Sequence, residues 1–159
     1  MNISTPDLCD AHPQEVQVCE LAFNGYGQQK QFGGQIETVK CFEDNSLVKE
    51  ALARDGAGKV LVVDGGGSMR RALLGDQIAA SAVKNQWTGM VFYGCVRDVE
   101  EIDNLPIGVK ALGSVPVKTD KRGEGQTNIA LRFGGVIFTP GHFLYADRNG
   151  VIIAETSLL

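Results

Sequence analysis

The stretch Lys-Val-Leu-Val-Val-Asp-Gly-Gly-Gly at residues 59–67 opens the segment that decides the fold. Its apolar beginning predicts a buried strand in the middle of a sheet, and the glycines that follow predict a tight turn. A helix is predicted from about Asp76 to Gln86, and residues 89–96 predict a second buried strand. Strand, glycine turn, helix and strand make a βαβ-like unit, which commonly binds ligands outside the carboxyl ends of its strands.

The chain before this unit predicts a short helix, a strand and a second helix. Thr5 can cap the first helix, with Pro6 at its first helical position. Residues 34–41 alternate apolar and polar side chains at a period near two, which is typical of a strand with one covered face. Residues 44–46 offer several N-caps for a helix that continues to about Arg54.

The chain after Val115 changes to short β-rich pieces separated by glycine-containing breaks. The strongest hairpin signal is Asn149-Gly150, which lies between the apolar runs 143–146 and 151–153. No repeat or linker separates the two halves of the sequence. The sequence therefore predicts one α/β domain spanning residues 1–159, with a β-rich C-terminal half.

Composition narrows the class of protein. With 159 residues and 43% hydrophobic residues the chain can bury one core, and its net charge of −4 does not give the basic footprint of a nucleic-acid binder. A basic protein partner fits that charge better. The sequence has no apolar run long enough to span a membrane and no secretory signal pattern at its start, so we expect a soluble cytoplasmic protein.

The four cysteines are widely spaced and only two histidines accompany them. Neither a zinc-finger pattern nor a CxxC redox pair can be assembled from these residues. We therefore expect reduced cysteines that are mostly buried. Two histidines without a nucleophile-elbow motif also give no basis for a Ser-His-Asp or Cys-His catalytic arrangement.

The first candidate site begins at Gly75-Asp76, at the predicted mouth of the central helix. The first N–H groups of a helix have no partner within the helix, and the helix dipole favours an anion there. A substrate anion could therefore rest on the N–H groups of Gln77 and Ile78. The alternative is an ordinary N-cap formed by Asp76, worth about 1 kcal/mol.

The second candidate is Arg97-Asp98, which follows the second predicted strand. Arg97 can bind a carboxylate or a keto oxygen, and Asp98 can hold Mg²⁺ or Mn²⁺. The alternative is a surface ion pair of little energetic value. The nearby Glu100, Glu101 and Asp103 could supply a second metal ligand or a proton carrier, or they could form a solvated acidic face.

A small basic loop contains Lys118, Lys121 and Arg122. It could contact an anionic substrate or a neighbouring subunit, or it could be a solvated turn. Residues 64–68 lack the lysine of a phosphate-binding P-loop, and residues 123–126 open no predicted helix and lack a third glycine. Nucleotide binding is therefore weakly supported by the sequence.

Gly75-Asp76, followed after twenty residues by Arg97-Asp98, resembles the GD-x20-RD signature of class II aldolase-like proteins typified by the regulator of ribonuclease activity A. The resemblance extends over nearly the whole chain. The flanking segments that share it are Thr-Pro-Asp-Leu-Cys-Asp at 5–10, Thr-Val-Lys-Cys-Phe-Glu-Asp-Asn at 38–45, Val-Val-Asp-Gly-Gly-Gly at 62–67, Arg-Gly-Glu-Gly-Gln at 122–126 and Leu-Tyr-Ala-Asp at 144–147.

This resemblance implies an α/β/β/α sandwich that assembles as a ring-shaped homotrimer with active sites at subunit interfaces. Similar proteins act as 4-hydroxy-4-methyl-2-oxoglutarate aldolases, which yield pyruvate, and often decarboxylate oxaloacetate. By the same resemblance Arg97 would bind the carboxylate or keto group of a small 2-oxo acid, and Asp98 would hold a divalent metal, Mg²⁺ or Mn²⁺. The residues that would bind the substrate carboxylate are Gly75, Asp76, Gln77 and Ile78.

Both reactions pass through a pyruvate enolate, whose negative charge a metal and Arg97 would stabilise without a Schiff-base lysine. A single carboxylate suffices for Mg²⁺, because this ion keeps several of its waters. The same family also contains proteins that inhibit ribonuclease E by binding its basic scaffold region. The chain ends at Leu159 without the C-terminal extension of dedicated aldolases, which favours that regulator branch. His142 stands where many similar proteins have Asp, and we expect a structural consequence.

Overall fold

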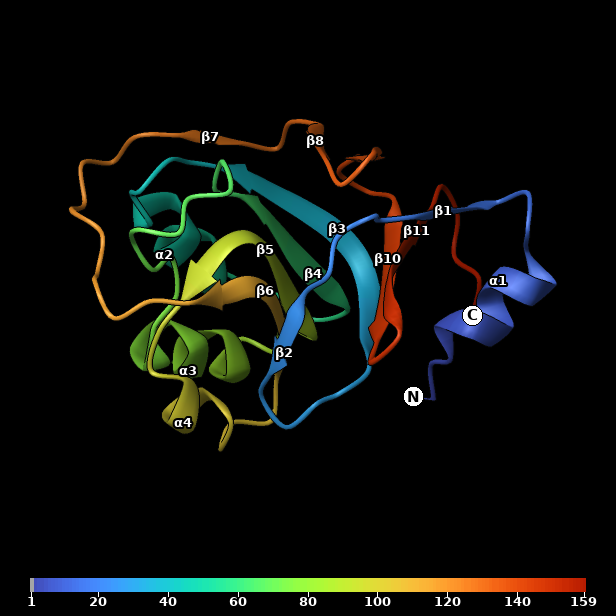
Figure 1. The fold of residues 1–159 in the computed structure, drawn as a ribbon, viewed down its shortest axis with the longest axis horizontal. Coiled ribbons are helices and arrows are strands. Elements are labelled where there is room, and N and C mark those ends of the chain that lie inside the picture. The colour runs from blue at the N-terminus through green and yellow to red at the C-terminus, as the bar shows by residue number, and fades with distance from the viewer. Residues whose placement is uncertain (1) are drawn as a thin grey trace.

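A mixed β-sheet forms the centre of the computed structural model, which describes residues 2–159 (Figure 1). Its nine strands include eight in the order β1-β11-β10-β3-β4-β5-β6-β2, and β7 pairs separately with β3. Strands β8 and β9 form a separate hairpin. The strands are β1 (Val16–Val18), β2 (Asn24–Tyr26), β3 (Phe32–Lys40), β4 (Lys59–Asp64), β5 (Gly89–Val96), β6 (Gly108–Ser114), β7 (Gln126–Thr127), β8 (Leu131–Phe133), β9 (Val136–Phe138), β10 (Phe143–Asp147) and β11 (Gly150–Ala154).

Strands β3, β4, β5 and β6 lie parallel to one another and form the middle of the sheet. The side chains of residues 60–63 on β4 are fully buried, as the continuous apolar run predicts for a strand with neighbours on both sides. The predicted βαβ unit is confirmed, because β4 and β5 pair in parallel and the helix Asp76–Lys84 connects them.

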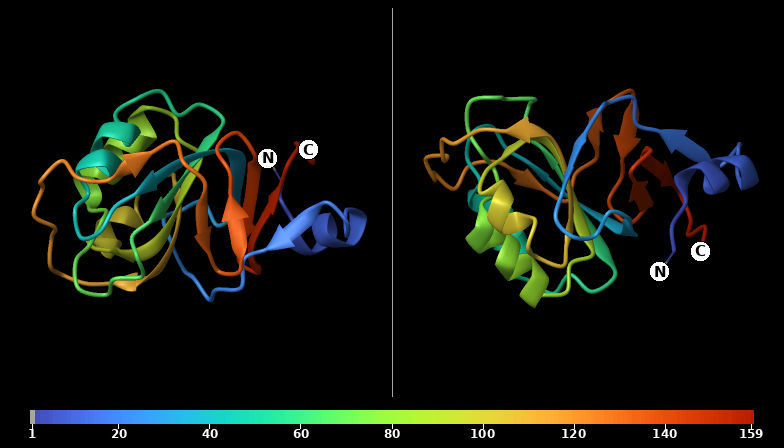
Figure 2. Two further views of the ribbon diagram at one scale, coloured as in Figure 1. Left: turned by 90° about the horizontal axis from the view of Figure 1, so that it is seen from above. Right: turned by 60° about the horizontal axis from the view of Figure 1, so that its bottom comes forward.

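Three helices cover one face of the parallel strands, and a fourth lies at the other end of the molecule (Figure 2). On α3, Ala79 and Ala82 are buried and Ile78 and Val83 pack beside them, which confirms the predicted apolar stripe. The helices are α1 (Thr5–Ala11), α2 (Ser46–Leu52), α3 (Asp76–Lys84) and α4 (Val99–Ile102).

The opposite face of the parallel strands is covered by β8, β9, β10 and β11. There Val62 shares a cluster with Phe138 and Ile153, and the rings of Tyr93 and Phe133 stack 4.9 Å apart. Helix α1 packs on the far side of β10 and β11. The mixed α/β fold therefore has four layers: helices, parallel strands, antiparallel strands and a final helix. Most strands of the two middle layers belong to one continuous sheet.

The cap of the N-terminal helix and the turn of the final hairpin each differ from the prediction by one residue. Ser4, and not Thr5, caps α1 by accepting a hydrogen bond from the Asp7 N–H. Thr5 instead donates its N–H and its hydroxyl to the buried Asp147 carboxylate, each at 2.7 Å. The final hairpin exists as predicted, but residues 148–149 form its turn and Gly150 already pairs with Asp147.

The second helix and three strands also differ from the sequence-based expectation. Helix α2 ends at Leu52, before the predicted Arg54, and its N-cap Asn45 makes no side-chain capping bond. The strand β6 was not predicted, and neither were the short strands β1 and β2. Three-residue strands are too short for their side chains to show a period of two.

All four cysteines are free thiols, and three of them are buried. Burial raises the pKa of Cys19 to about 11 and that of Cys41 to about 12, so both thiols stay protonated near neutral pH. The expectation of buried thiols is confirmed except at Cys9, which is partly exposed. Among residues 2–159 no helix is long and apolar enough to cross a membrane.

Candidate anion and metal site

The mouth of helix α3 provides two free backbone donors. Within residues 2–159 the N–H groups of Gln77 and Ile78 make no hydrogen bond. Helix α3 begins at Asp76, as predicted, and Gly75 is its N-cap, so the alternative of an Asp76 N-cap is not observed. Asp76 therefore leaves these donors unoccupied, which is what an anion-binding helix mouth requires.

The predicted pair Arg97-Asp98 lies directly beside this helix mouth. The Arg97 N–H donates to the Leu74 carbonyl at 2.9 Å, which ties the end of β5 to the residue before Gly75. The Asp76 N–H donates to Asp98 Oδ2 at 3.1 Å. Two segments separated by twenty residues in the sequence thus meet through hydrogen bonds from backbone donors.

Asp98 adopts the left-handed backbone conformation, with φ 56° and ψ 42°. Asp and Asn tolerate this region better than most other residues with a side chain. The turn ends β5 sharply and starts helix α4, where the Ile102 N–H donates to the Asp98 carbonyl at 2.9 Å. This backbone geometry presents the Asp98 carboxylate to the helix mouth rather than to α4.

Gly75 is required by close packing and not by its backbone angles. Its φ of −124° and ψ of −174° are open to any residue. A Cβ atom at this position, however, would lie 2.8 Å from Asp98 Oδ2 and 3.6 Å from Arg97 Nε. The absence of a side chain at Gly75 is therefore what allows the Asp98 carboxylate to reach the Asp76 N–H.

Arg97 and Asp98 form only a loose ion pair. Arg97 Nε lies 3.9 Å from Asp98 Oδ2, and the two side chains are 37% and 36% exposed. Arg97 also reaches the Pro116 carbonyl through a long 3.4 Å contact. Since a guanidinium group carries five N–H donors, most of its hydrogen-bonding capacity remains available to a ligand.

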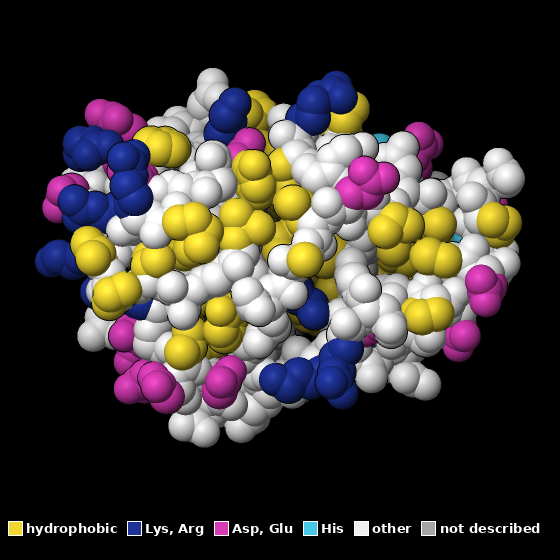
Figure 3. All heavy atoms as spheres, in the orientation of Figure 1, with side chains coloured by type: hydrophobic (Ala, Val, Ile, Leu, Met, Phe, Trp, Pro, Cys, Tyr) yellow, Lys and Arg dark blue, Asp and Glu magenta, His cyan; other side chains and the backbone are white. Residues whose placement is uncertain are grey.

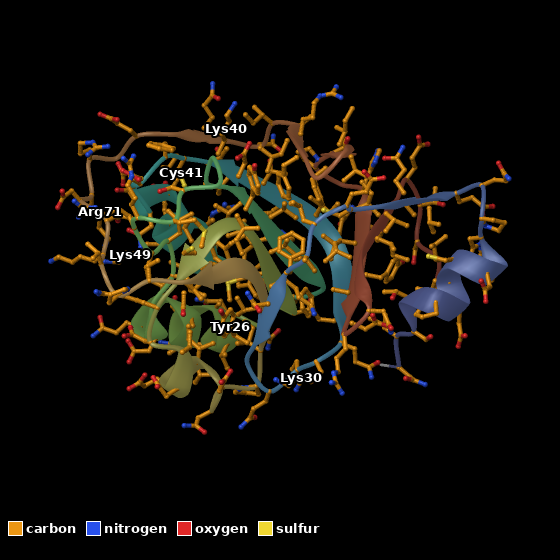
Figure 4. The ribbon with its side chains drawn as sticks, viewed as in Figure 1. Tyr26, Lys30, Lys40, Cys41, Lys49 and Arg71 are labelled. Carbon is orange, nitrogen blue, oxygen red and sulfur yellow. The ribbon has the colours of Figure 1, made fainter. Side chains whose placement is uncertain are left out.

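A pocket of about 290 Å³ joins these residues and adds three lysines. Lys118 and Lys121 come from the predicted basic loop, and Lys49 comes from α2. Lysine and arginine side chains gather at this end of the molecule (Figure 3), where Figure 4 labels Lys49 and Arg71. Four cationic side chains therefore surround two carboxylates, so the pocket favours anions.

The loop that carries these lysines is held in place from two sides. Arg71 donates to the Lys118 carbonyl at 3.0 Å. The buried Asp44 accepts hydrogen bonds from the N–H groups of Arg122 at 2.9 Å and Glu124 at 3.1 Å. Burial alone would raise the pKa of Asp44, but these bonds and those from Ser46 hold it well below its usual range.

The donor set fits a metal that keeps most of its waters. Within residues 2–159 no group of three or more His, Cys, Asp or Glu side chains converges on one point. Asp98 Oδ2 is occupied by the Asp76 N–H, whereas Asp98 Oδ1 makes no hydrogen bond or ion pair with these residues. One free carboxylate oxygen facing an open pocket suits Mg²⁺ or Mn²⁺.

The remaining candidates of the sequence lie outside the pocket. Glu100 and Glu101 are exposed, as expected for a solvated face, but Asp103 accepts a hydrogen bond from the Gly27 N–H at 2.8 Å. Arg122 is absent from the pocket lining, although its loop neighbours are present. His142 lies at the turn before β10, where its carbonyl accepts from the Ile36 N–H at 2.8 Å.

Sequence reasoning missed Lys49, Asn45 and Ser81 as pocket residues. Lys49 occupies an exposed position of α2, where a lysine is ordinary, and no local pattern distinguishes it. The side chain of Asn45 donates to the Leu73 carbonyl at 3.1 Å, and its Oδ1 accepts from Thr119. These contacts depend on how α2 packs beside α3, which local sequence does not reveal.

The RraA-like family model, described as Aldolase/RraA, matches residues 5–153. The chain therefore belongs to the RraA-like family.

Relatives within this family carry different functional names. A protein of Pseudomonas aeruginosa strain LESB58 named "Putative 4-hydroxy-4-methyl-2-oxoglutarate aldolase" is 60% identical over 99% of this chain and 98% of its own length. The structure of the RNA-processing inhibitor RraA from Thermus thermophilus is 41% identical, with a TM-score of 0.94 over 100% of this chain and 98% of that one. Chain length therefore does not separate the aldolase name from the regulator name, contrary to the sequence-based expectation.

A third relative carries yet another name. A structure from Geobacillus kaustophilus HTA426, described as S-adenosylmethionine: 2-dimethylmenaquinone methyltransferase, is 50% identical. Its TM-score is 0.97 over 98% of this chain and 97% of that one. Close similarity in this family thus identifies the fold, and the activity has to be argued from the pocket of this chain.

Proposed function

We propose that the protein is a divalent-metal-dependent lyase acting on small 2-oxo acids. The proposed reactions are aldol cleavage of 4-hydroxy-4-methyl-2-oxoglutarate and decarboxylation of oxaloacetate, both of which yield pyruvate. The observation that supports this proposal is the convergence of the free N–H groups of Gln77 and Ile78 with Arg97 and Asp98 in one pocket. The aldolase name of the 60% identical relative agrees with it.

The charges of the pocket fit a dicarboxylate substrate. Both proposed substrates carry two carboxylates, and the pocket offers two kinds of anion partner. The free N–H groups at the mouth of α3 can bind one carboxylate, while Arg97 can bind the other carboxylate or the keto oxygen. Lys118, Lys121 and Lys49 raise the local concentration of such anions through their field.

The residues also fit the chemistry of an enolate. Cleavage of the carbon–carbon bond leaves negative charge on the former keto oxygen, and Arg97 can stabilise that charge as it develops. Asp98 would hold the divalent cation, which supplies Lewis-acid stabilisation of the same oxygen. The Asp76 N–H fixes Asp98 Oδ2, so the orientation of the free oxygen is set before any ligand arrives.

The test is pyruvate release from oxaloacetate and from 4-hydroxy-4-methyl-2-oxoglutarate, measured with Mg²⁺, with Mn²⁺ and with a chelator. We expect activity to require the cation. Arg97→Ala and Asp98→Asn should each lower kcat/KM by roughly a hundredfold or more, because each removes charge at the reacting centre. Asn keeps the left-handed turn and an oxygen that can accept the Asp76 N–H, so the second variant isolates the loss of charge.

Matched control variants distinguish chemistry from general damage. Arg132→Ala removes an exposed arginine from β8, and Glu100→Gln removes an exposed carboxylate two residues after Asp98. Both controls should keep full activity. Pyruvate release that continues at the wild-type rate in both Arg97→Ala and Asp98→Asn would contradict the proposed function.

A second candidate function is regulation of ribonuclease E by binding its basic scaffold region. It is supported by the 41% identity to the RNA-processing inhibitor RraA and by the net charge of −4. Binding between an acidic protein and a basic scaffold should weaken as salt rises. A pull-down with ribonuclease E of the source organism, repeated at low and high salt, tests this function, and absence of capture at low salt would remove it.

The two functions can be separated with the same variants. Arg97→Ala and Asp98→Asn alter a pocket, whereas scaffold binding would use the outer surface of the protein. We expect both variants to bind the scaffold as the wild type does. Loss of scaffold binding in the pocket variants would place the two functions on one site.

A further inference from the structure

A second cation-lined pocket, distinct from the candidate active site, lies beside the paired strands β2 and β6. Its volume is about 390 Å³, and residues 23–26, Lys30, Lys110 and Arg148 contribute to its walls. Figure 4 shows Tyr26 and Lys30 on the segment around β2, well apart from Lys49 and Arg71 beside the first site. No residue lines both pockets. We call it the Lys110 pocket.

Lys110 is the unusual residue of this pocket, because it is largely buried yet makes no hydrogen bond or ion pair. The residue is only 8% exposed, and it forms no hydrogen bond and no ion pair with any residue of 2–159. No side-chain nitrogen among these residues is both fully buried and without a partner, so the Lys110 ammonium group is accessible from the pocket that it lines. Its strand neighbours Val109 and Ala111 point into the helix-covered core, so Lys110 points to the opposite face of the sheet. An ammonium group at the floor of such a pocket loses part of its hydration, and an anion bound in the pocket would offset that loss.

The charges around Lys110 are mostly of the same sign. Lys30 and Arg148 line the same pocket, and Lys30 is directed by a 2.8 Å hydrogen bond to the Gly27 carbonyl. Asp147 is the acidic group whose charge acts on Lys110, but no ion pair joins them. The Asp147 carboxylate is already occupied by the donors of Thr5 and by the Asn149 N–H.

The lowered pKa of Lys110 agrees with the excess of positive charge around it. Burial lowers the pKa of Lys110; Asp147 acts in the opposite direction, and Lys30 and Arg148 lower the pKa further. Three cationic side chains against one carboxylate leave an excess of about two positive charges when Lys110 is protonated. A single dianion would balance that excess.

We propose that the Lys110 pocket binds an oxyanion that carries two negative charges, namely phosphate or the phosphoryl group of a small organic molecule. Lys110 would donate to its oxygens from the floor of the pocket, and Lys30 and Arg148 from the rim. Gly25 lies directly beside Lys110, since a Cβ at that position would be in van der Waals contact with Lys110 Nζ at 3.5 Å. Phe23 and Tyr26 give the pocket apolar walls that an organic group could contact.

The experiment is a titration of the ¹⁵N-labelled protein with inorganic phosphate and with glycerol 3-phosphate, followed by amide chemical shifts at low ionic strength. Residues 24–26 and 110–111 report on the Lys110 pocket, and residues 75–78 report separately on the candidate active site. We expect saturable shifts at the first group of residues. Tighter binding of glycerol 3-phosphate would identify a phosphorylated molecule as the ligand, whereas equal or tighter binding of phosphate would identify the free ion.

Variants assign the shifts to the proposed residues. Lys110→Met keeps the length of the side chain without its charge, and it should weaken binding at least tenfold while leaving shifts at residues 75–78 unchanged. The exposed changes Lys30→Gln and Arg148→Gln provide a second route if Lys110→Met does not fold, and each should weaken binding severalfold. Lys84→Gln, at the end of α3, is the matched control and should bind as the wild type does.

Two results would overturn the proposal. One is the absence of saturable shifts at residues 24–26 and 110–111, beyond those that sodium chloride produces at the same ionic strength. The other is unchanged binding in the charge variants that fold. Neither result depends on pyruvate release, so the Lys110 pocket can fail while the proposed lyase stands, or the reverse.

Discussion

Gly75 matters to the candidate site because it has no Cβ atom. Gly75→Ala is compatible with the backbone angles of this position, but the new Cβ would displace Asp98 Oδ2 from the Asp76 N–H. We expect pyruvate release to fall at least tenfold, while the melting temperature changes by less than about 3 °C, or roughly 1 kcal/mol. Activity assays and calorimetry check the two halves of this prediction.

Gly113→Ala is the control for that substitution. A Cβ at Gly113 would meet only the end of the Met69 side chain, at 3.4 Å, and its backbone is not in the left-handed region. We expect it to keep activity. Equal loss of activity in both variants would show that Gly75→Ala acts through general packing and not through Asp98.

Lys110 carries a charge that the folded state disfavours, so its removal should stabilise the protein. Its folded-state pKa is lowered, which means that the stability cost is present at pH values below the folded pKa. The cost disappears as pH rises toward the unfolded value of about 10.4. Lys110→Met should therefore raise the melting temperature near pH 7 by about 2–4 °C in phosphate-free buffer, equivalent to about 1 kcal/mol.

The stabilisation by Lys110→Met should shrink as the pH approaches about 10, where the wild-type lysine loses its charge. Thermal unfolding across this pH range provides the measurement. A variant that is less stable than the wild type near pH 7 in phosphate-free buffer would show that Lys110 has a stabilising partner in the folded protein.

At the scale of elements, Asp44 links helix α2 to the loop that carries the pocket lysines. Its folded-state pKa is lowered by hydrogen bonds, so its contribution to stability is present above the unfolded value of about 4. That contribution is lost as pH falls through lower values. Asp44→Asn replaces one acceptor oxygen by a donor that faces N–H groups, and it should cost about 1–3 kcal/mol at pH 7.

Urea unfolding at pH 7 and at pH 3 tests this assignment. The difference between wild type and Asp44→Asn should be smaller at the lower pH, because the carboxyl of the unfolded wild-type chain then binds a proton that the folded state does not. The variant should also raise KM for oxaloacetate, since Lys118 and Lys121 would no longer be held at the pocket. An unchanged KM would show that the loop is positioned without Asp44.

The elements with strong local patterns could be predicted from the sequence. Strand β4 and helix α3 were predicted because a continuous apolar run and an apolar stripe each bury one uninterrupted surface. Strand β6 was not predicted, and its buried Lys110 interrupts the apolar run. The pairing of β3 with β10 joins residues more than a hundred positions apart, and local chemistry does not encode it.

The candidate site could be predicted in part for the same reason. Asp76, Arg97 and Asp98 stand at the ends of predictable elements, so their convergence follows from the βαβ connection. The helix start at Asp76 was predicted correctly, whereas the alternative of an Asp76 N-cap is not observed, because Gly75 is the cap. Lys49 reaches the pocket only through the packing of α2 beside α3, and the local sequence around an exposed lysine does not predict that contact.

At the scale of the whole molecule, three large apolar side chains remain exposed around the carboxyl ends of the parallel strands. Phe42, Met69 and Val117 are each about half exposed. Because exposed apolar groups near a pocket often belong to an interface, we expect the chain to assemble as the ring-shaped trimer implied by its resemblance to the family. The expected mass in solution is about 51 kDa, three times the 17.0 kDa chain.

Light scattering after size-exclusion chromatography measures that mass. The double variant Phe42→Glu and Met69→Glu should lower it toward the monomer and reduce pyruvate release if the pocket is completed by a neighbouring subunit. Val18→Glu, an exposed apolar position on β1, is the control and should keep the trimer. A monomeric wild-type protein with full activity would contradict both the trimer and a shared site.

The hydrogen bonds from the N–H groups of Asp76 and Arg97 divide the pocket into a part that can be redesigned and a part that cannot. Backbone N–H groups hold the Asp98 carboxylate and the start of α3 in position. Exchanging the side chains around them therefore leaves the free N–H groups of Gln77 and Ile78 in place. Lys118 and Lys121 lie on a separate loop, which hydrogen bonds to Asp44 and from Arg71 hold in place. An engineer who wished to change the acid that this scaffold accepts would therefore vary residues 118–121 and keep residues 74–76 and 97–98 untouched.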